Sequence, residues 1–353
     1  MKVIDVLSHH RVYRWFLNYL AVACIFIDRE WIWKKYYVLM TIFSVFGSGV
    51  MLYSLIVFIR DIDSVAVIMH HGTINIDIII STQVCFIHRH TIRELVKGMS
   101  KSFDYESPIV SQFLDDLQEK RVKEMEKVFK YIMFTAVFMQ INLIIFSIVE
   151  KYMKNLDYML LFPCWFPFDL SYLPYHILAY FWQHINVEAI GLLICAGMAF
   201  SYIVYSHLTS QIILLKFAIE KLKVRAYELA CSTLGDNTKE IFEDRLRKCY
   251  IKGTIQCVKH YSMIIDYYTQ AKNLFKILYL IIFLTGLIIL TSTGFALVSE
   301  NTSLKIKFIG VNAVQMVYLY IFCWLAEEIS DLNVHSCGIL CVSGNAVKSG
   351  SGK

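Results

Sequence analysis

The sequence predicts an all-α membrane protein: a polytopic helical bundle with six recognisable transmembrane helices and long cytoplasmic helix extensions. Apolar residues make up 57 % of the 353 residues and charged residues only 18 %, whereas soluble proteins are about half apolar and about a quarter charged. The apolar residues gather in runs long enough to cross a hydrocarbon layer that is roughly 30 Å thick. Lys and Arg are abundant in alternate loops between these runs, as in multi-pass membrane proteins.

Six runs come close to the length of about 20 residues that a membrane-spanning helix needs. The second run contains the polar residues His70, His71, Asn75 and Asp77. Together the runs form a single transmembrane domain, residues 36–327, between a cytoplasmic N-terminus, residues 1–35, and an atypical short tail, residues 328–353. The predicted spans are residues 36–58, 65–87, 131–149, 177–205, 277–298 and 308–325.

The distribution of basic residues predicts the orientation. Lys and Arg are numerous before the first span, between spans two and three, and between spans four and five, but the outer loop of residues 150–176 has only Lys151 and Lys154. Because basic loops stay on the cytoplasmic side, we expect the N-terminus inside the cell, in a multi-pass protein of the plasma membrane. The net charge of +5 then reflects loops beside lipid headgroups, and nucleic acid is not an expected partner.

No motif in the sequence supports a catalytic role, a cofactor or a metal site. Cys337 and Cys341 lack further ligands at the spacing that zinc requires. Ionisable residues inside the spans are costly and often functional. For Asp77, an ion path and a satisfied structural role remain open, whereas Glu188 is expected to pair with His184 one helical turn away.

Long helices are predicted on the cytoplasmic side. Ser107 and Pro108 resemble a helix cap followed by proline at the first helical position, and the helix that they start leads directly into span three. Span four continues past the membrane, and a second amphipathic helix leads into span five after a turn at residues 234–238. These extensions either pack together within one subunit or form a platform for subunit assembly. The apolar positions of the second helix include Ile241, Leu246, Ile251, Ile255 and Val258.

The outer loop contains the stretch LLFPCWFPFDLSYLPY, which holds three of the four prolines in the chain, namely Pro163, Pro167 and Pro174. Prolines end helices, so we expect irregular structure between spans three and four. Two roles remain open for the loop: a lid over the mouth of the bundle, or an aromatic belt at the membrane interface. Its aromatic residues are Phe162, Trp165, Phe166, Phe168, Tyr172 and Tyr175.

This loop and three other stretches resemble insect odorant receptors. The family has a Pro-aromatic-Pro-Phe-Asp run in the second outer loop, and then an aromatic-rich helix that runs to a Gln. The same residues appear here, and the resemblance extends over most of residues 35–332. The matching stretches are LLFPCWFPFDLSYLPYHILAYFWQ, ELVKGMS, CYIKGTIQCVKHYSMIIDYYTQAKNLFKILYL and YLYIFCWLAEEISDL.

The resemblance implies a ligand-gated, non-selective cation channel that is gated by small apolar odorants. In this family a variable odorant-binding subunit assembles with a shared co-receptor into a tetramer, and the cytoplasmic helix ends anchor the subunits to one another. The ligand lies in the outer half of the bundle among helices two, three, four and six. The residues expected to bind it here are His71, Met139, Asn142, Phe146, Tyr180, Gln183, Phe308, Val311 and Gln315, below loop residues Pro163, Trp165 and Pro167.

One departure from the family pattern concerns the end of the sequence. Family members continue into a seventh membrane helix that lines the pore, whereas residues 333–353 read NVHSCGILCVSGNAVKSGSGK. The longest apolar run there, residues 337–342, is too short to span a membrane. We therefore expect a chain that lacks the seventh helix and does not conduct by itself. The alternatives are a gustatory-type receptor, against which the proline-rich loop argues, and a non-conducting receptor fragment.

Overall fold

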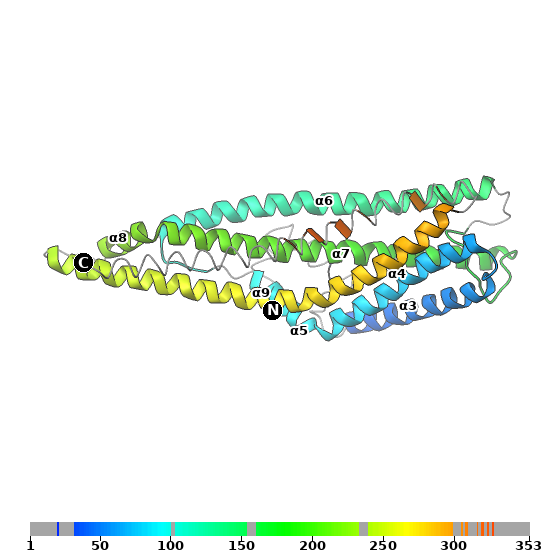
Figure 1. Ribbon diagram of the computed structural model, residues 1–353, viewed down its shortest axis with the longest axis horizontal. Helices are drawn as coiled ribbons and strands as arrows, with labels where there is room; N and C mark the ends of the chain where they lie inside the picture. The colour runs from blue at the N-terminus through cyan, green and yellow to red at the C-terminus, as the bar shows by residue number, and fades with distance from the viewer. Residues whose placement is uncertain are drawn as a thin grey trace.

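The computed structural model describes residues 20, 32–99, 103–153, 160–232 and 239–298, together with positions 305, 308, 309, 316, 319, 320, 323, 324 and 327. The helices of these residues lie roughly along one long axis and form an elongated bundle (Figure 1). They are α3 (Ile32–Val57), α4 (Ile62–Ile87), α5 (Arg89–Met99), α6 (Pro108–Met153), α7 (Leu173–Glu220), α8 (Leu222–Ser232) and α9 (Lys239–Val298).

Five of the helices, α3, α4, α6, α7 and α9, are long and apolar enough to cross a membrane. They contain the first five predicted spans, which confirms the all-helical polytopic architecture. The sixth predicted span, residues 308–325, lies largely outside the described residues. The apolar runs form helices because peptide groups in hydrocarbon must hydrogen-bond within the chain, and a helix pairs them all within one segment.

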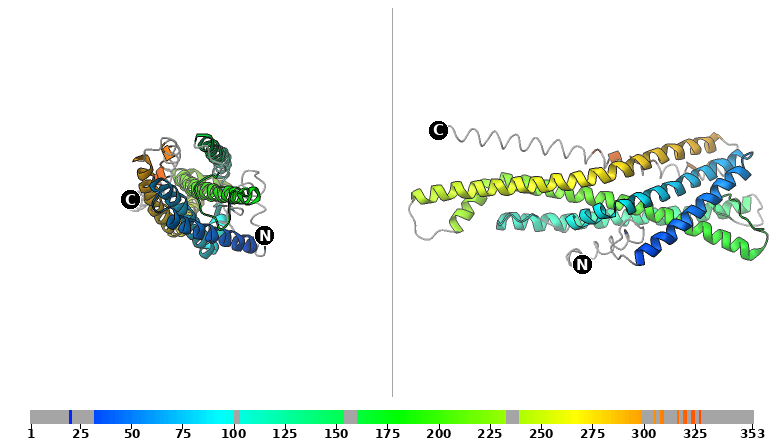
Figure 2. Two further views of the ribbon diagram at one scale, coloured as in Figure 1. Left: turned by 90° about the vertical axis from the view of Figure 1, so that its right-hand side faces the viewer. Right: turned by 90° about the horizontal axis from the view of Figure 1, so that it is seen from below.

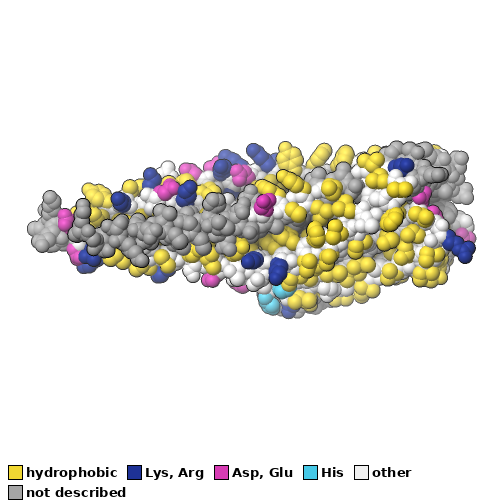
Figure 3. Space-filling model, viewed as in Figure 1, with side chains coloured by type: hydrophobic (Ala, Val, Ile, Leu, Met, Phe, Trp, Pro, Cys, Tyr) yellow, Lys and Arg dark blue, Asp and Glu magenta, His cyan; other side chains and the backbone are white. Residues whose placement is uncertain are grey.

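Three helices are much longer than a membrane is thick. The helices α6, α7 and α9 contain 46, 48 and 60 residues, which correspond to roughly 70 to 90 Å at about 1.5 Å per residue. Their membrane spans therefore continue without interruption into the charged segments, as the sequence predicts. Figure 3 shows the same division on the surface, with apolar side chains over one end and charged side chains over the other.

The proline-rich loop differs from the prediction at its end. Pro174 does not end a helix, because it lies in the first turn of α7, which begins at Leu173 rather than at residue 177. A proline is tolerated there because the first amide groups of a helix have no acceptor within it. Pro163 and Pro167 lie in the irregular segment, as predicted.

A second difference is a break in the helix that follows span four. The chain turns at Lys221, and α8 begins at the next residue. The backbone bonding nevertheless continues across the break, since the Lys221 amide donates to the Phe217 carbonyl at 3.0 Å. Arg225 also donates from its guanidinium to the Ala218 carbonyl at 3.0 Å. The Phe217 and Ala218 carbonyls therefore keep hydrogen-bond donors across the break. The predicted turn at residues 234–238 lies outside the described residues.

The helices pack around α9, which contacts α4, α5, α7 and α8. The helix α3 packs on α4. By contrast, α6 packs mainly on α7, and it lies at the edge of the bundle when viewed along the long axis (Figure 2). Its membrane part leaves large apolar side chains exposed, such as Phe134 and Phe138 at 70 % and 53 %. Apolar side chains face lipid at no cost, so this surface suits a membrane environment.

A buried polar network joins the charged ends of the helices. The Gln211 amide oxygen on α7 lies 2.9 Å from His260 Nε2 on α9. Because an amide oxygen only accepts, His260 Nε2 donates, and because burial lowers the pKa of His260 and keeps it neutral, its Nδ1 accepts from the Tyr105 hydroxyl. Arg225 adds a cation–π contact 4.4 Å from the Tyr105 ring centroid, and the Phe103 ring stacks on His260. The segment before α6 is therefore fixed to α7, α8 and α9.

We predict that Tyr105→Phe destabilises this end of the bundle. The change keeps the ring but removes the hydroxyl that donates to buried His260, and an unsatisfied buried acceptor costs about 1–3 kcal/mol. Thermal unfolding of the purified chain in nanodiscs is expected to show a lower melting temperature. Tyr131→Phe, at a position that is 73 % exposed, serves as the control. Equal melting temperatures for the two variants would contradict the role of the network.

Candidate functional site

The irregular segment of residues 160–172, which the loop charges predict to be outside the cell, lies at the end of the bundle where α7 begins, beside the α3–α4 hairpin (Figure 1). Gln183 of α7 fixes its start. The Gln183 side-chain oxygen accepts from the Leu161 amide at 2.8 Å, and its nitrogen donates to the Phe162 carbonyl at 2.8 Å. Gln183 is fully buried, so both halves of its amide replace the backbone partners that a helix would have supplied.

Ser54 of α3 fixes the next part of the segment. Its hydroxyl oxygen accepts from the Trp165 amide at 2.8 Å while the hydroxyl donates to the Val50 carbonyl at 2.7 Å. The Cys164 sulfur lies 3.4 Å from the same hydroxyl oxygen. The Trp165 ring also contacts Tyr53, with 4.3 Å between the ring centroids. The segment is therefore held at two points, one on α7 and one on α3.

Below the segment lies a group of packed rings, which we call the outer aromatic cluster. The Phe162 ring stacks on His71 of α4 with 4.4 Å between centroids. His70 lies edge-on to both His71 and Phe308, at 5.3 and 5.4 Å. Trp182 of α7 lies edge-on to Phe166 at 5.7 Å. The cluster thus joins the loop to α4, α7 and the part of the chain that contains Phe308.

A polar group adjoins the outer aromatic cluster, and we call it the Gly47 polar group. A Cβ atom at Gly47 would lie 3.1 Å from Asn186 Nδ2, 3.3 Å from the Trp182 ring and 3.8 Å from Asn75 Oδ1. These two amide atoms and the Trp182 Nε1 are buried and have no hydrogen-bond partner among the described residues. A buried polar atom without a partner is costly, so two donors and one acceptor here are suited to bonding a small polar ligand group.

The structure brings four of the predicted ligand residues into or beside the outer aromatic cluster. His71 and Phe308 belong to its stacked rings, and Tyr180 packs against its buried residues. Gln183 lies beside them, but its amide is already bonded to the loop backbone. Its direct role is therefore to position the loop.

Of the remaining predicted ligand residues, only Asn142 has a side chain that the structure describes, and it is not among the rings of this cluster. Asn142 lies on α6, and its amide donates to the Phe138 carbonyl of the same helix at 2.7 Å. Val311 and Gln315 lie outside the described residues, as do the side chains of Met139 and Phe146. Of the predicted loop residues, Pro163 and Trp165 are partly buried, whereas Pro167 is exposed.

Sequence reasoning missed the ligand-facing potential of Trp182, Asn186 and Asn75. Their positions carried a signal, because Asn186 follows Gln183 by three residues and Asn75 follows His71 by four. Residues at these spacings share one face of a helix. Their convergence on Gly47 depends on how α3, α4 and α7 pack, which the spacing does not give.

The ionisable residues within the spans have local partners. Ser81 donates to Asp77 at 3.2 Å, and both residues line a cavity of about 50 Å³ between α4, α7 and α9. His184 Nε2 lies 3.8 Å from a Glu188 oxygen, which agrees with the expected pairing. Among the described residues, no three His, Cys, Asp or Glu side chains gather in a way that suits a metal ion.

These features define a multi-pass helical membrane protein with an aromatic and partly polar site under an outer loop. A sequence profile described as 7tm odorant receptor matches residues 69–335. The chain belongs to this odorant receptor family, whose members are odorant-binding, ligand-gated channels rather than enzymes.

Two solved structures share the fold. The insect olfactory receptor OR5 from Machilis hrabei has a TM-score of 0.70 and 9 % sequence identity, with 94 % of this chain and 83 % of that chain covered. The same receptor in complex with eugenol has a TM-score of 0.68 and 11 % identity over the same shares of the two chains. A search of curated proteins finds no match.

We predict that Gln183→Leu releases the start of the outer loop. The change leaves the Leu161 amide and the Phe162 carbonyl without their partner, at a cost of about 1–3 kcal/mol for each group. Faster protease cleavage within residues 160–172 and a lower melting temperature are expected. Gln112→Leu, an exposed amide on α6, is the control. Unchanged cleavage in Gln183→Leu would exclude this role.

Proposed function

We propose that this chain is a tuning subunit: it binds small, mainly apolar odorants and gates a non-selective cation channel that it forms with the family co-receptor. The observation that carries the proposal is the Gly47 polar group beside the outer aromatic cluster. Aromatic walls with a few placed polar atoms are typical of sites for small organic ligands. Membership of the odorant receptor family supports the same function.

The ligand class follows from the site's chemistry. The rings of Phe162, His71 and Phe308 offer mainly apolar surface, whereas Asn186, Trp182 and Asn75 offer two donors and one acceptor. A volatile ring or chain with one hydroxyl or carbonyl group matches both features. Eugenol, an aromatic phenol that the related OR5 receptor binds, is therefore a rational first probe. His71, Tyr180 and Phe308 are the predicted residues that we place in the site, with Met139, Phe146, Val311 and Gln315 as proposed neighbours.

We further propose that the loop of residues 160–172 serves both roles that its sequence left open. Phe162 and Phe166 are 3 % and 8 % exposed and pack into the bundle, as expected for a lid. Tyr172 at the end of the loop and Tyr175 in the first turn of α7 are 59 % and 45 % exposed, as expected for residues at a membrane interface. The first part of the loop thus closes the site, and the second part faces the headgroups.

For assembly, we favour the platform over packing within one subunit alone. Ile251, Ile255 and Val258 of α9 are each about half exposed, at 50 %, 49 % and 53 %, and lie along one helix face. They belong to the part of α9 before the predicted span 277–298, where lipid does not cover them. An exposed apolar stripe outside the membrane indicates a protein partner. We assign it to contacts with the co-receptor in a tetramer.

The proposed orientation places the N-terminus and the charged helix ends in the cytoplasm, and residues 160–172 outside the cell. It is supported by the bias of Lys and Arg and by the charged end of the bundle in Figure 3.

We predict that cells expressing this chain with the co-receptor respond to an odorant panel that includes eugenol with a cation current. The chain alone is expected to give no current.

Asn186→Leu removes one donor from the Gly47 polar group and is expected to raise the half-maximal concentration for a hydroxylated odorant about tenfold. Asn273→Leu, exposed on α9, is the control. Two outcomes would contradict the proposal. One is an equal current from this chain with and without the co-receptor, and the other is an equal current from the co-receptor with and without this chain.

We predict that Trp165→Ala alters odorant sensitivity, because the Trp165 ring holds the lid against Tyr53 of α3. Dose–response curves of the co-expressed channel measure the effect. Tyr172→Ala, in the exposed part of the loop, is expected to leave the curves unchanged. If the two variants behave alike, the loop is an interface belt and not a lid.

A further inference from the structure

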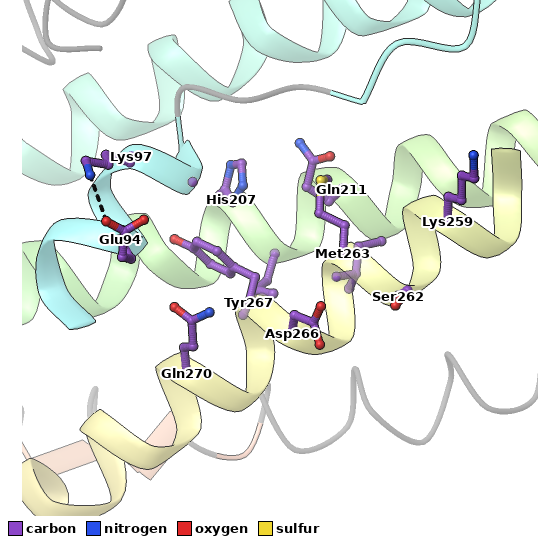
Figure 4. Close-up of a pocket in the computed structure, with 13 residues that line it drawn as sticks. Glu94, Lys97, His207, Gln211, Lys259, Ser262, Met263, Asp266, Tyr267 and Gln270 are labelled. Carbon is purple, nitrogen blue, oxygen red and sulfur yellow. Dashed lines mark hydrogen bonds and ion pairs between the residues drawn. The ribbon is translucent and has the colours of Figure 1, made fainter. Parts of the chain in front are cut away.

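A cavity of about 440 Å³ lies between α5, α7 and α9, about 40 Å along α7 from Gln183 and the outer loop (Figure 4). Its volume falls in the range of about 300–1,000 Å³ that is typical of sites for small organic ligands. The α9 wall begins at Lys259 and ends at Gln270. The other walls come from Glu94, Lys97 and Gly98 of α5 and from His207, Leu208 and Gln211 of α7.

The cavity lies beyond the lipid headgroups. Lys259 and Gln270 lie about 27 and about 10 Å before the predicted span of α9 that starts at residue 277, whereas the headgroup layers add only roughly 5–8 Å on each side of the hydrocarbon core. The predicted span of α7 ends at residue 205, but it is longer than the about 20 residues that a span needs, so His207 also fits outside the hydrocarbon core. A ligand of this cavity therefore comes from the aqueous phase, on the side that the proposed orientation assigns to the cytosol.

Two buried side chains of α7 present hydrogen-bond donors to the cavity. Arg121 has only donors, so it donates to His207 Nδ1 at 3.0 Å, and the His207 proton is then on Nε2. The Gln211 oxygen lies 2.9 Å from His260 Nε2, which leaves the Gln211 amide nitrogen as a donor. His207 and Gln211 are 3 % and 4 % exposed, and neither nitrogen has a partner among the described residues. Residues four apart share one helix face, so the two donors suit one ligand group.

Arg121 is a buried cation without an anionic partner. It is 7 % exposed, and besides His207 its guanidinium donates to the Ile203 carbonyl at 3.5 Å. Glu124, about one turn further along α6, is exposed and lies 4.0 Å from Lys120 instead. Within the part of the chain that the structure describes, no carboxylate bonds Arg121. Buried charges are normally paired with a charge of opposite sign, and an anion bonded to the far nitrogen of His207 supplies that charge.

The other charges around the cavity cancel one another. Lys97 and Glu94 form an ion pair at 2.7 Å. Lys259 and Asp266 are exposed and lie about 10 Å apart along α9, and Figure 4 shows both on this helix with Gln211 across from them. When Arg121 is counted, three cations surround the cavity against two anions. A singly charged anion balances this excess, whereas a doubly charged phosphate exceeds it.

The rest of the lining suits an organic body attached to the anion. Leu208 and Ile264 are buried, and Met263 adds a thioether beside them. The Tyr267 ring packs on His207 with 4.9 Å between the centroids, and its hydroxyl already donates to the Leu95 carbonyl at 3.2 Å. This leaves the Tyr267 ring as an apolar surface. A carboxylate has two acceptor oxygens, one for each of the two donors on α7.

We propose that this cavity binds a small soluble monocarboxylate with an apolar body. His207 Nε2 and the Gln211 amide nitrogen each donate to one carboxylate oxygen, and Arg121 balances the charge through His207. The apolar body lies against Leu208 and Met263. A molecule bound there contacts α5, α7 and α9 together and stabilises their arrangement.

The test uses the full chain in nanodiscs at neutral pH and low ionic strength, with benzoate as the probe. Thermal unfolding and calorimetric titration are the two measurements. Benzamide has a similar shape without the charge, and phenylphosphonate carries close to two charges. Benzoate is expected to raise the melting temperature and to bind about tenfold more tightly than either. An equal effect of the three compounds, or of potassium chloride at the same ionic strength, would overturn the proposal.

Two charge variants are expected to act in opposite directions. Lys259→Gln removes a cation and lowers the affinity for benzoate about twofold, whereas Asp266→Asn removes an anion and raises it about twofold. Added salt is expected to reduce both changes. Glu243→Gln and Lys276→Gln, which are exposed elsewhere on α9, are the matched controls. Changes of the same sign in Lys259→Gln and Asp266→Asn would rule out an anionic ligand.

Two further variants locate the bound benzoate. Ser262→Phe fills the cavity from an exposed position and is expected to abolish binding. Gln211→Glu keeps the acceptor for His260 but replaces the donor by a second acceptor, and is expected to weaken binding about tenfold or more. Binding that persists in Ser262→Phe but weakens in Asn186→Leu would place benzoate in the outer site and overturn the proposal.

Discussion

The structure depends on one constraint: peptide groups inside a hydrocarbon layer find hydrogen-bond partners only within the protein. Most of the chain meets it by forming long uninterrupted helices, of which α9 has 60 residues. The segment of residues 160–172 meets it differently. Gln183 and Ser54 supply the bonds that its backbone lacks. The irregular segment is held on the bundle because these two buried side chains bond three of its backbone groups, those of Leu161, Phe162 and Trp165.

The two ends of the bundle use polar side chains in different ways. Beside the outer aromatic cluster, Asn186 and Asn75 have polar atoms with no partner among the described residues, which suits the proposed binding of a small polar ligand group. At the other end, Gln211, His260 and Tyr105 bond to one another and join α7 to α9. Burial lowers the pKa of His260 to about 4. His260 is therefore neutral at physiological pH, as the direction of its hydrogen bonds requires.

Hydropathy and charge patterns predicted the first five helices and their long extensions, because these depend on local composition. The candidate site was predicted only in part. His71, Tyr180 and Phe308 lie in or against the outer aromatic cluster, but Asn142 bonds to its own helix on α6. Helical spacing gives the face on which a residue lies, but not which helix covers that face. The structure places α6 mainly against α7, a contact that the helical spacing of Asn142 does not predict.

The sequence by itself determined that this protein is a helical membrane protein of the odorant receptor family, since hydrophobic run length, loop charge and the proline-rich motif are local properties. Only the tertiary structure decided the role of individual polar residues. Gln183, a predicted ligand residue, bonds the loop backbone through both halves of its amide. Asn186 drew no such expectation, yet its side chain and that of Asn75 both lie against Gly47. The reason is physical: whether a buried amide is satisfied depends on atoms that packing brings from distant parts of the chain.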